Sequence, residues 1–310
     1  MSNVTQPILV FGSTGQQGGS VTQALLNTGW QVRAFVRDLH SERAVALQSA
    51  GVELVKGDLG DMLSIHNAMK GTYGIFSVQP SSGQGAMYGV SDEDEVRYGI
   101  QIADIAVESG VQHLVYSSTD AIGDEPTGMG HFDSKARIEE HVRTLPINTT
   151  IVRPAAFMEM LLMPGFGLDE GRFNFFMHPE QSMQLLALED LGLIVAAVFA
   201  DPKNFKDITL SVASDEVTGR DIETVFSEVA GRRISYSRFS NDVLSNNAFL
   251  AKLTQLLDTG ILAGNANLDN LRIINPALLS LKDWLAGRRR HDFLEALGTP
   301  GEWRYGHSQE

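Results

Sequence analysis

A glycine-rich turn near the amino terminus constrains the fold of this 310-residue chain more than any other feature. It follows the apolar run at residues 8–11, and Gly12, Gly15 and Gly18 recur at every third position. The first glycine lets the chain turn sharply out of a strand, the second lets the backbone approach a pyrophosphate, and the third lets the next helix pack closely on the sheet. The first N–H groups of that helix then point at the phosphates. The turn therefore predicts a dinucleotide-binding site.

The residues after the turn predict a complete strand–helix–strand unit. Apolar residues recur at helical spacing up to Gly29, and residues 32–36 form the next apolar strand. Arg37 follows that strand directly, where proteins that prefer NAD usually carry an acidic residue for the ribose hydroxyls. A guanidinium suits a 2′-phosphate instead, which favours NADP. Two alternatives stay open: Arg37 is an ordinary solvated charge, or Asp38 holds the ribose and NAD binds.

Strands and helices go on alternating through the first half of the chain. The pattern predicts strands at residues 52–55, 73–78, 113–117 and 149–154, and helices at 62–69, 93–109 and 132–143. Such regular alternation indicates an α/β fold with a doubly wound parallel Rossmann sheet, whose ligands bind at the carboxyl ends of the strands. We expect residues 1–155 to form this NADP-binding domain.

The remaining residues, 156–310, predict a smaller, mainly helical domain for a substrate or partner, with some elements returning to the Rossmann sheet. Residues 158–184 are rich in Met, Phe, Gly and Pro without clear periodicity, which indicates an irregular apolar wall or lid. Helices are expected at 189–200, at 218–230 and at 275–286. The second begins with a capping box of Thr218 and Asp221, and the third with Asn275 as its cap.

Composition and charge exclude several classes of protein. A formal charge of −14 argues against binding of nucleic-acid backbones, and any regulatory role would then act through protein partners. No apolar run approaches the length of a membrane span, and the start of the chain lacks a secretory signal. Because the chain has no cysteine, we expect a cytoplasmic protein without a structural zinc site, and the 8 histidines show no metal-binding spacing.

Several short motifs together point to one family. They are GSTGQQGGSV at residues 12–21, Arg37, Lys56-Gly57-Asp58-Leu59, Tyr116-Ser117-Ser118, His131-Phe132-Asp133-Ser134-Lys135 and Arg153-Pro154. In this combination the chain resembles the NmrA-like family of atypical short-chain dehydrogenase/reductases, from residue 8 to about 297, most strongly the branch that includes the human NmrA-like redox sensor. The resemblance implies that NADP(H) binds in the Rossmann domain. Some members reduce quinones, dyes or phenylpropanoids, and others report the NADPH/NADP ratio to a partner protein.

The resemblance also implies a set of cofactor-binding residues. Arg37 would hold the 2′-phosphate, Asp58 and Leu59 would flank the adenine, Gln79 would lie beside the ribose or nicotinamide, and Phe157 would pack near the nicotinamide. Asp58 could instead be a turn residue and Phe157 a core residue. The pyrophosphate would be held by Gly12, Thr14, Gly15, Gln16, Gln17 and Gly18.

The segment from His131 to Lys135 bears on catalysis. Active short-chain reductases carry Tyr-x-x-x-Lys on a helix, where this spacing places both side chains on one face and the lysine lowers the tyrosine pKa. Here His131 stands in place of the tyrosine, while Lys135 can still donate to the nicotinamide ribose hydroxyls. The ammonium would depress the pKa of the imidazole and leave it neutral, a weak acid for a carbonyl oxygen. Ser118 is a further candidate for the proton, or a strand-end residue bound to backbone groups.

Two interpretations follow. In the first, the chain is a redox-sensing regulator with weak or no turnover: NADP(H) occupies the cleft, and loops at residues 81–91 and 158–184 respond and engage a regulatory protein partner. In the second, it is an NADPH-dependent reductase of a small apolar acceptor such as a quinone or enone, with Lys135 and either His131 or Ser118 handling the proton. The missing tyrosine favours the first, and the apolar segment favours the second.

Overall fold

The computed structural model describes residues 6–82, 89–123 and 125–298, which form two compact units. The first unit comprises residues up to 119 together with 130–153 and 191–210, and the second comprises 120–129, 154–190 and 211 onward. The chain passes from the first unit to the second after residue 119 and again after residue 153, and the expected boundary at residue 155 stays a prediction. Residues 191–210 then return to the first unit.

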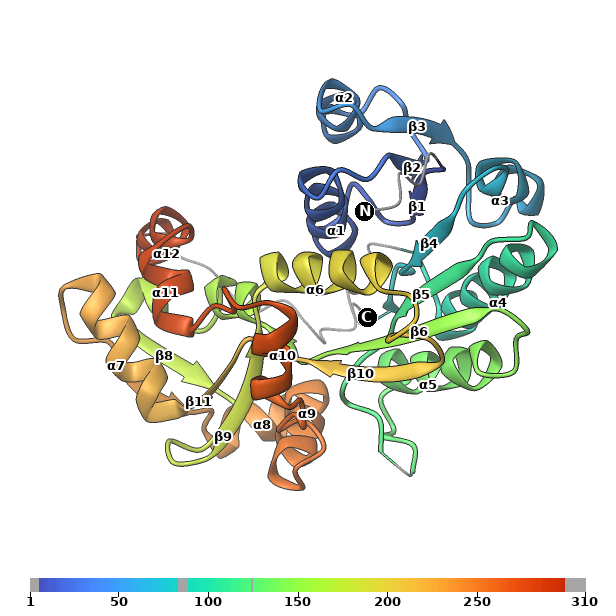
Figure 1. Ribbon diagram of the computed structural model, residues 1–310. Helices are drawn as coiled ribbons and strands as arrows, with labels where there is room; N and C mark the ends of the chain where they lie inside the picture. Colours follow the sequence, from blue (N-terminus) through green and yellow to red (C-terminus); the bar gives the residue numbers. More distant parts are fainter. Residues whose placement is uncertain (1–5, 83–88, 124, 299–310) are drawn as a thin grey trace. The chain divides into compact units, whose positions relative to one another are not determined.

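A seven-stranded parallel sheet forms the centre of the first unit, with the strand order β10-β6-β5-β4-β1-β2-β3 (Figure 1). The backbone bonds from Asp207 N to Thr149 O and from Ala155 N to Val212 O show that β10 runs in the direction of β6. The remaining neighbours also pair in parallel. The strands are β1 (Ile8–Val10), β2 (Val32–Val36), β3 (Glu53–Lys56), β4 (Gly74–Ser77), β5 (His113–Ser117), β6 (Asn148–Pro154) and β10 (Ile208–Val212).

Helices cover both faces of this sheet. They are α1 (Gln16–Asn27), α2 (Glu42–Ser49), α3 (Met62–Met69), α4 (Asp92–Glu108), α5 (Gly130–Val142) and α6 (Leu188–Ala200). Alternate strand residues such as Leu9 and Leu114 form one buried cluster with α3, α4 and α5. On the other face, α6 packs Phe199 edge-on against His113 of β5. The two layers cover the sheet on both sides, as its apolar parallel strands require.

Two small sheets and a set of short helices make up the second unit. Strands β11, β9 and β7 form one sheet, and β12 and β8 form the other. A cluster of phenylalanines, among them Phe173 and Phe226 with ring centroids 5.0 Å apart, forms an aromatic core. The elements are β7 (Ala156–Phe157), η3 (Met158–Leu162), η4 (Leu168–Glu170), β8 (Arg172–Phe175), β9 (Ser182–Leu186), β11 (Asp215–Thr218), α7 (Gly219–Ala230), β12 (Ser235–Arg238), α8 (Asn241–Asn246), α9 (Ala248–Asp258), α10 (Leu268–Ile274), α11 (Leu281–Ala286) and α12 (Arg290–Ala296).

The structure confirms the expected α/β architecture, a doubly wound parallel Rossmann sheet with a smaller, mainly helical carboxyl-terminal part. The capping box of Thr218 and Asp221 at the start of α7 is also present. Residues 158–184, expected to be irregular, contain η3, η4, β8 and the start of β9. Among the described residues, no helix is both long and apolar enough to cross a bilayer.

The prediction of a single helix over residues 275–286 is wrong. Asn275 ends α10, and its side chain is used elsewhere: Nδ2 donates to Asp190 Oδ1 at 2.7 Å, and Oδ1 accepts from Ala277 N at 3.2 Å. The next helix, α11, begins after Ser280, whose hydroxyl accepts from Asp283 N. The Asn275 side chain, which we expected to cap a helix, thus binds the buried carboxylate of Asp190 instead.

Candidate functional site

The carboxyl ends of the parallel strands carry most of the predicted nucleotide-binding residues. Gly12 to Gly15 follow β1, Arg37 follows β2, Asp58 follows β3 and Gln79 follows β4. Because the strands are parallel, these segments emerge at one edge of the sheet. This edge is where open α/β sheets bind their ligands.

The glycine turn has the backbone shape that a phosphate site requires. Gly12 has φ +64, and the N–H of Gly15 donates to its carbonyl at 2.8 Å. A Cβ atom on Gly18 would lie 2.4 Å from the Gly12 carbonyl, so only glycine fits there. Gly15 begins α1 without a side-chain cap, and the first turn of α1 contains no acidic residue. The positive end of the helix dipole therefore lacks a neutralising carboxylate on the helix itself.

Two arginines lie on the segments beside this turn. Arg37 is exposed, and the guanidinium of Arg43, in α2, donates from Nη1 to Thr14 O at 2.9 Å. Asp38 Oδ1 accepts from His40 N at 2.9 Å and so helps to shape the loop before α2. Arg43 was not among the predicted site residues, because no helix was expected at residues 42–49. The pattern Ser41-Glu42, a cap followed by an acidic first turn, was the available indication.

The loop after β3 contains the two residues expected near the adenine. Asp58 Oδ1 accepts from Gly60 N at 2.8 Å, so its carboxylate has the role of a turn residue. Leu59 packs against the core of the first unit and is partly buried. The adenine contacts of both residues stay predictions.

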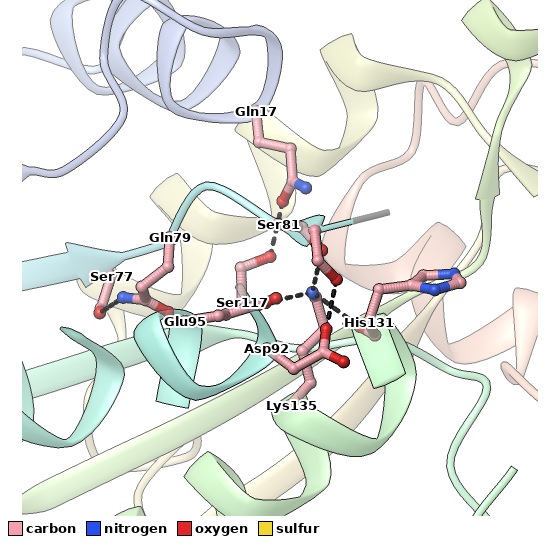
Figure 2. Close-up of polar contacts among 10 residues, drawn as sticks. Gln17, Ser77, Gln79, Ser81, Asp92, Glu95, Ser117, His131 and Lys135 are labelled. Carbon is pink, nitrogen blue, oxygen red and sulfur yellow. Dashed lines mark hydrogen bonds and ion pairs between the residues drawn. The ribbon is translucent and has the colours of Figure 1, made fainter. Parts of the chain in front are cut away.

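Two amide side chains form hydrogen bonds with serines at the ends of central strands. Gln17 Oε1, on α1, accepts from Ser117 Oγ of β5 at 2.7 Å (Figure 2). Gln79 is buried and donates from Nε2 to Ser77 Oγ at 2.7 Å. The bond from Gln17 links the glycine turn to the end of β5. This link is a contact between residues far apart in the sequence that no local pattern predicts.

Lys135 lies at the centre of the polar cluster in Figure 2. It extends from α5 and donates to Ser81 Oγ at 3.2 Å, to the carbonyl of His131 at 3.0 Å and to Glu95 Oε1. Three acceptors match the three hydrogens of an ammonium group. Glu95 is on α4 and is 1% exposed, whereas the Lys135 side chain is 14% exposed. The pair therefore presents its cation, not its carboxylate, to the surroundings.

His131, which stands in place of the tyrosine of an active reductase, does not direct its ring at the Lys135 ammonium. Figure 2 shows its ring directed away from the Lys135 ammonium, and the ring packs on Phe132 with centroids 4.0 Å apart. Burial, with a smaller contribution from the Lys135 charge, lowers the pKa of His131 from 6.5 to about 4. The imidazole is therefore neutral at pH 7, as the sequence analysis expected.

Two further predicted residues, Ser118 and Phe157, lie outside the polar cluster around Lys135. Ser118 is 4% exposed, its N–H donates to Val152 O, and its hydroxyl has no hydrogen-bond partner in the described ranges. Phe157 belongs to the second unit, where β7 pairs with β9 and Phe157 lies opposite Leu186. The sensor interpretation expects the loop at residues 81–91 to respond to NADP(H). Residues 83–88 of that loop lie outside the described residues.

A surface cavity of about 730 Å³ lies at the opposite edge of the sheet. Its lining includes Gln112, Asn148 and Ile208, at the amino-terminal ends of β5, β6 and β10. It shares no residue with the predicted nucleotide site. The cavity and the predicted nucleotide site are therefore separate features of the first unit.

Comparison with known proteins identifies the family. A model of the NmrA-like family matches residues 4–270. An NmrA-like family domain-containing oxidoreductase of Malbranchea aurantiaca is 31% identical over 255 residues, which cover 76% of this chain and 76% of the relative. An NmrA-like family domain-containing protein of Dictyostelium discoideum is 29% identical over 251 residues, which cover 75% of this chain and 80% of that protein.

Solved structures show the same fold. NmrA, a negative transcriptional regulator in complex with NAD, matches with a TM-score of 0.75 at 20% identity, over 95% of this chain and 98% of NmrA. Triphenylmethane reductase of Citrobacter sp., complexed with NADP(H), matches with a TM-score of 0.74 at 21% identity, over 94% of this chain and 99% of the reductase. The family model and the 31% identical relative of Malbranchea aurantiaca show that the chain belongs to the NmrA-like family.

Proposed function

We propose that this protein is an NADP(H)-binding, redox-sensing regulator of the cytoplasm with weak or no turnover, related to the branch of the human NmrA-like redox sensor. NmrA, which has this fold, is a negative transcriptional regulator and has been crystallised with NAD. The observation that carries the proposal is the state of the catalytic segment. Lys135 is kept, but the residue in place of the tyrosine is a neutral imidazole directed away from the ammonium.

The residues at the nucleotide edge fit a phosphorylated dinucleotide. The uncapped start of α1, where Gly18 leaves no room for a Cβ atom, supplies backbone N–H groups for a pyrophosphate. The exposed Arg37 supplies a cation for a 2′-phosphate, with Arg43 beside the same turn. Lys135 would exchange its bond to Ser81 Oγ, which is 3.2 Å long, for one to a hydroxyl of the nicotinamide ribose. Thr14, Gln16 and Gln17 complete the pyrophosphate site, and Asp58, Leu59, Gln79 and Phe157 complete the adenine and nicotinamide contacts.

Nucleotide selectivity tests this assignment. We expect NADPH to bind more tightly than NADH, and Arg37→Ala to reduce the difference by about 10- to 100-fold, because a charge-assisted bond to phosphate is lost. Arg97→Ala, an exposed arginine of α4 paired with Asp94, serves as the control and should leave the selectivity unchanged. Equal affinities of the wild type for NADPH and NADH would remove the NADP assignment.

A second function, a reductase of a quinone, enone or dye, is favoured by the relatives named oxidoreductases and by the fold shared with triphenylmethane reductase. NADPH, when bound, would supply a hydride to the acceptor. The protein would then position a proton donor, Lys135, Ser118 or a water molecule, at the atom that gains negative charge.

Turnover distinguishes the two functions. As a sensor, the wild type should oxidise NADPH at background rates with quinones, enones and triphenylmethane dyes, and His131→Tyr should not raise these rates. Robust wild-type rates that disappear in Lys135→Ala would contradict the sensor function and support the reductase. Calorimetric titration of each variant with NADPH checks that a lost rate does not reflect lost binding.

A further inference from the structure

The buried carboxylate of Glu95 is a part of the site to which neither function above gives a role. It lies in the first turn of α4, within the acidic run Asp92–Glu95. Glu93 in the same run is solvated by contrast, because its side chain is 76% exposed and pairs with Arg137. Glu95 is 1% exposed, and its Oε2 has no hydrogen-bond partner in the portion of the chain that is described. A carboxylate buried in this way is costly unless a cation compensates it.

Lys135 is the cation that compensates Glu95. The close packing of α4 on α5 brings the two together, because Gly99 leaves room for Ile138. Two other carboxylates, Asp92 and Asp133, act electrostatically on His131 in this cluster. Asp92 Oδ1 accepts from Ser82 Oγ, and its carboxyl group lies against Gly130. His131 is neutral at pH 7, since burial lowers its pKa to about 4. Glu95 therefore cancels the charge of Lys135 from the buried side.

This cancellation matters for a nicotinamide because its two redox states differ in charge. The oxidised ring carries one positive charge and the reduced ring carries none. A lysine without a counter-charge beside the ring would repel the oxidised form and leave the reduced form unaffected. With its carboxylate partner behind it, the same lysine can hold ribose hydroxyls without this penalty.

We infer that Glu95 is a positioning residue that also sets the relative affinity of the site for NADP⁺ and NADPH, by offsetting the charge of Lys135 beside the nicotinamide. The inference rests on the proposed function, in which Lys135 contacts the nicotinamide ribose. It adds a determinant of the NADP⁺/NADPH ratio to which a sensor would respond.

The test compares the dissociation constants of NADP⁺ and NADPH in matched variants. Glu95→Gln should weaken NADP⁺ relative to NADPH by about tenfold, the order expected when one unit charge changes at a partly buried site. Glu93→Gln, two residues away on the same helix and exposed, should leave the ratio unchanged. Lys135→Gln should shift the ratio in the opposite direction, toward NADP⁺, and the double variant Glu95→Gln/Lys135→Gln should return it to the wild-type value.

The outcomes separate this inference from the function on which it rests. If Glu95→Gln weakens both nucleotides equally, or leaves the ratio unchanged, Glu95 has a merely structural role and the inference is overturned. If Glu95→Gln does not fold, Lys135→Gln decides. An unchanged ratio of the NADP⁺ and NADPH dissociation constants in that variant overturns the inference, and a shift toward NADP⁺ supports it. A wild type that binds neither nucleotide overturns the proposed function itself, and the inference with it.

Discussion

Gly18 shows how a single missing Cβ atom shapes the nucleotide turn. A Cβ at this position would lie 2.4 Å from backbone atoms of Gly12, which cannot move without opening the turn. The next residue, Gly19, is different: its Cβ would come no nearer than 3.3 Å to Ser13 O. Both glycines lie in the first part of α1. The two positions therefore form a matched pair for mutation.

We expect Gly18→Ala to lower NADPH affinity strongly and to destabilise the fold by about 1–3 kcal/mol, the range for overpacking in a tight site. Gly19→Ala should change stability by less than about 1 kcal/mol, because its higher helix propensity offsets the tight contact. Urea unfolding and titration with NADPH measure the two effects. Equal behaviour of the two variants would contradict the close approach of α1 to the turn.

Single residues of the site differ in how far the sequence predicts them. The spacing of His131 and Lys135 places both on α5 and needs only the helical period. The pairing of Lys135 with Glu95 depends on the packing of α4 against α5, which no local sequence pattern predicts. The one available indication was the helical spacing of Glu95 with Gly99 and Ile102, which places Glu95 on the buried face of α4.

At the scale of elements, β5 contains a histidine that links folding to pH. His113 is fully buried, and its Nε2 lies 2.8 Å from Thr150 Oγ1. Thr150 gives its own hydrogen to Phe205 O, so His113 must be the donor to Thr150. Burial lowers the pKa of His113 from 6.5 to about 4, an effect that Asp207 partly opposes. The folded state therefore holds this imidazole neutral, while the unfolded chain protonates it below pH 6.5.

This difference predicts that the protein loses stability as the pH falls from 6.5 toward 4, because the unfolded state then binds more protons. His113 alone should contribute about 2 kcal/mol of loss between pH 7 and pH 5. His113→Gln, which keeps a donor, should reduce the difference in unfolding free energy between these pH values by that amount, whatever its stability at pH 7. The same pH difference in both proteins would contradict the low pKa of His113.

Elements with strong local determinants were predicted closely. The expected helix at 62–69 and the expected strand at 113–117 have the observed bounds of α3 and β5. Asp61 caps α3, and β5 is a short, fully buried apolar run. The helix expected over 275–286 was wrong because Asp190, far away in the sequence, takes the side chain of Asn275. The pairing of β9 with β11 likewise depends on distant contacts that no local pattern reveals.

At the scale of the whole molecule, the predicted nucleotide residues are concentrated in the first unit. Phe157 is the exception, since it belongs to the second. The family and the fold could be read from motifs along the first half of the chain, because a Rossmann sheet repeats one local unit. The second unit carries no such repeat, which is why its small sheets were missed.

We propose that the first unit binds a phosphorylated nicotinamide dinucleotide at the carboxyl ends of its strands. Isothermal titration calorimetry of the purified, folded wild type with NADPH tests it most directly. We expect saturable heat with one nucleotide bound per chain, and a weaker response to NADH. Absence of heat with NADPH, NADP⁺, NADH and NAD⁺ alike would contradict it.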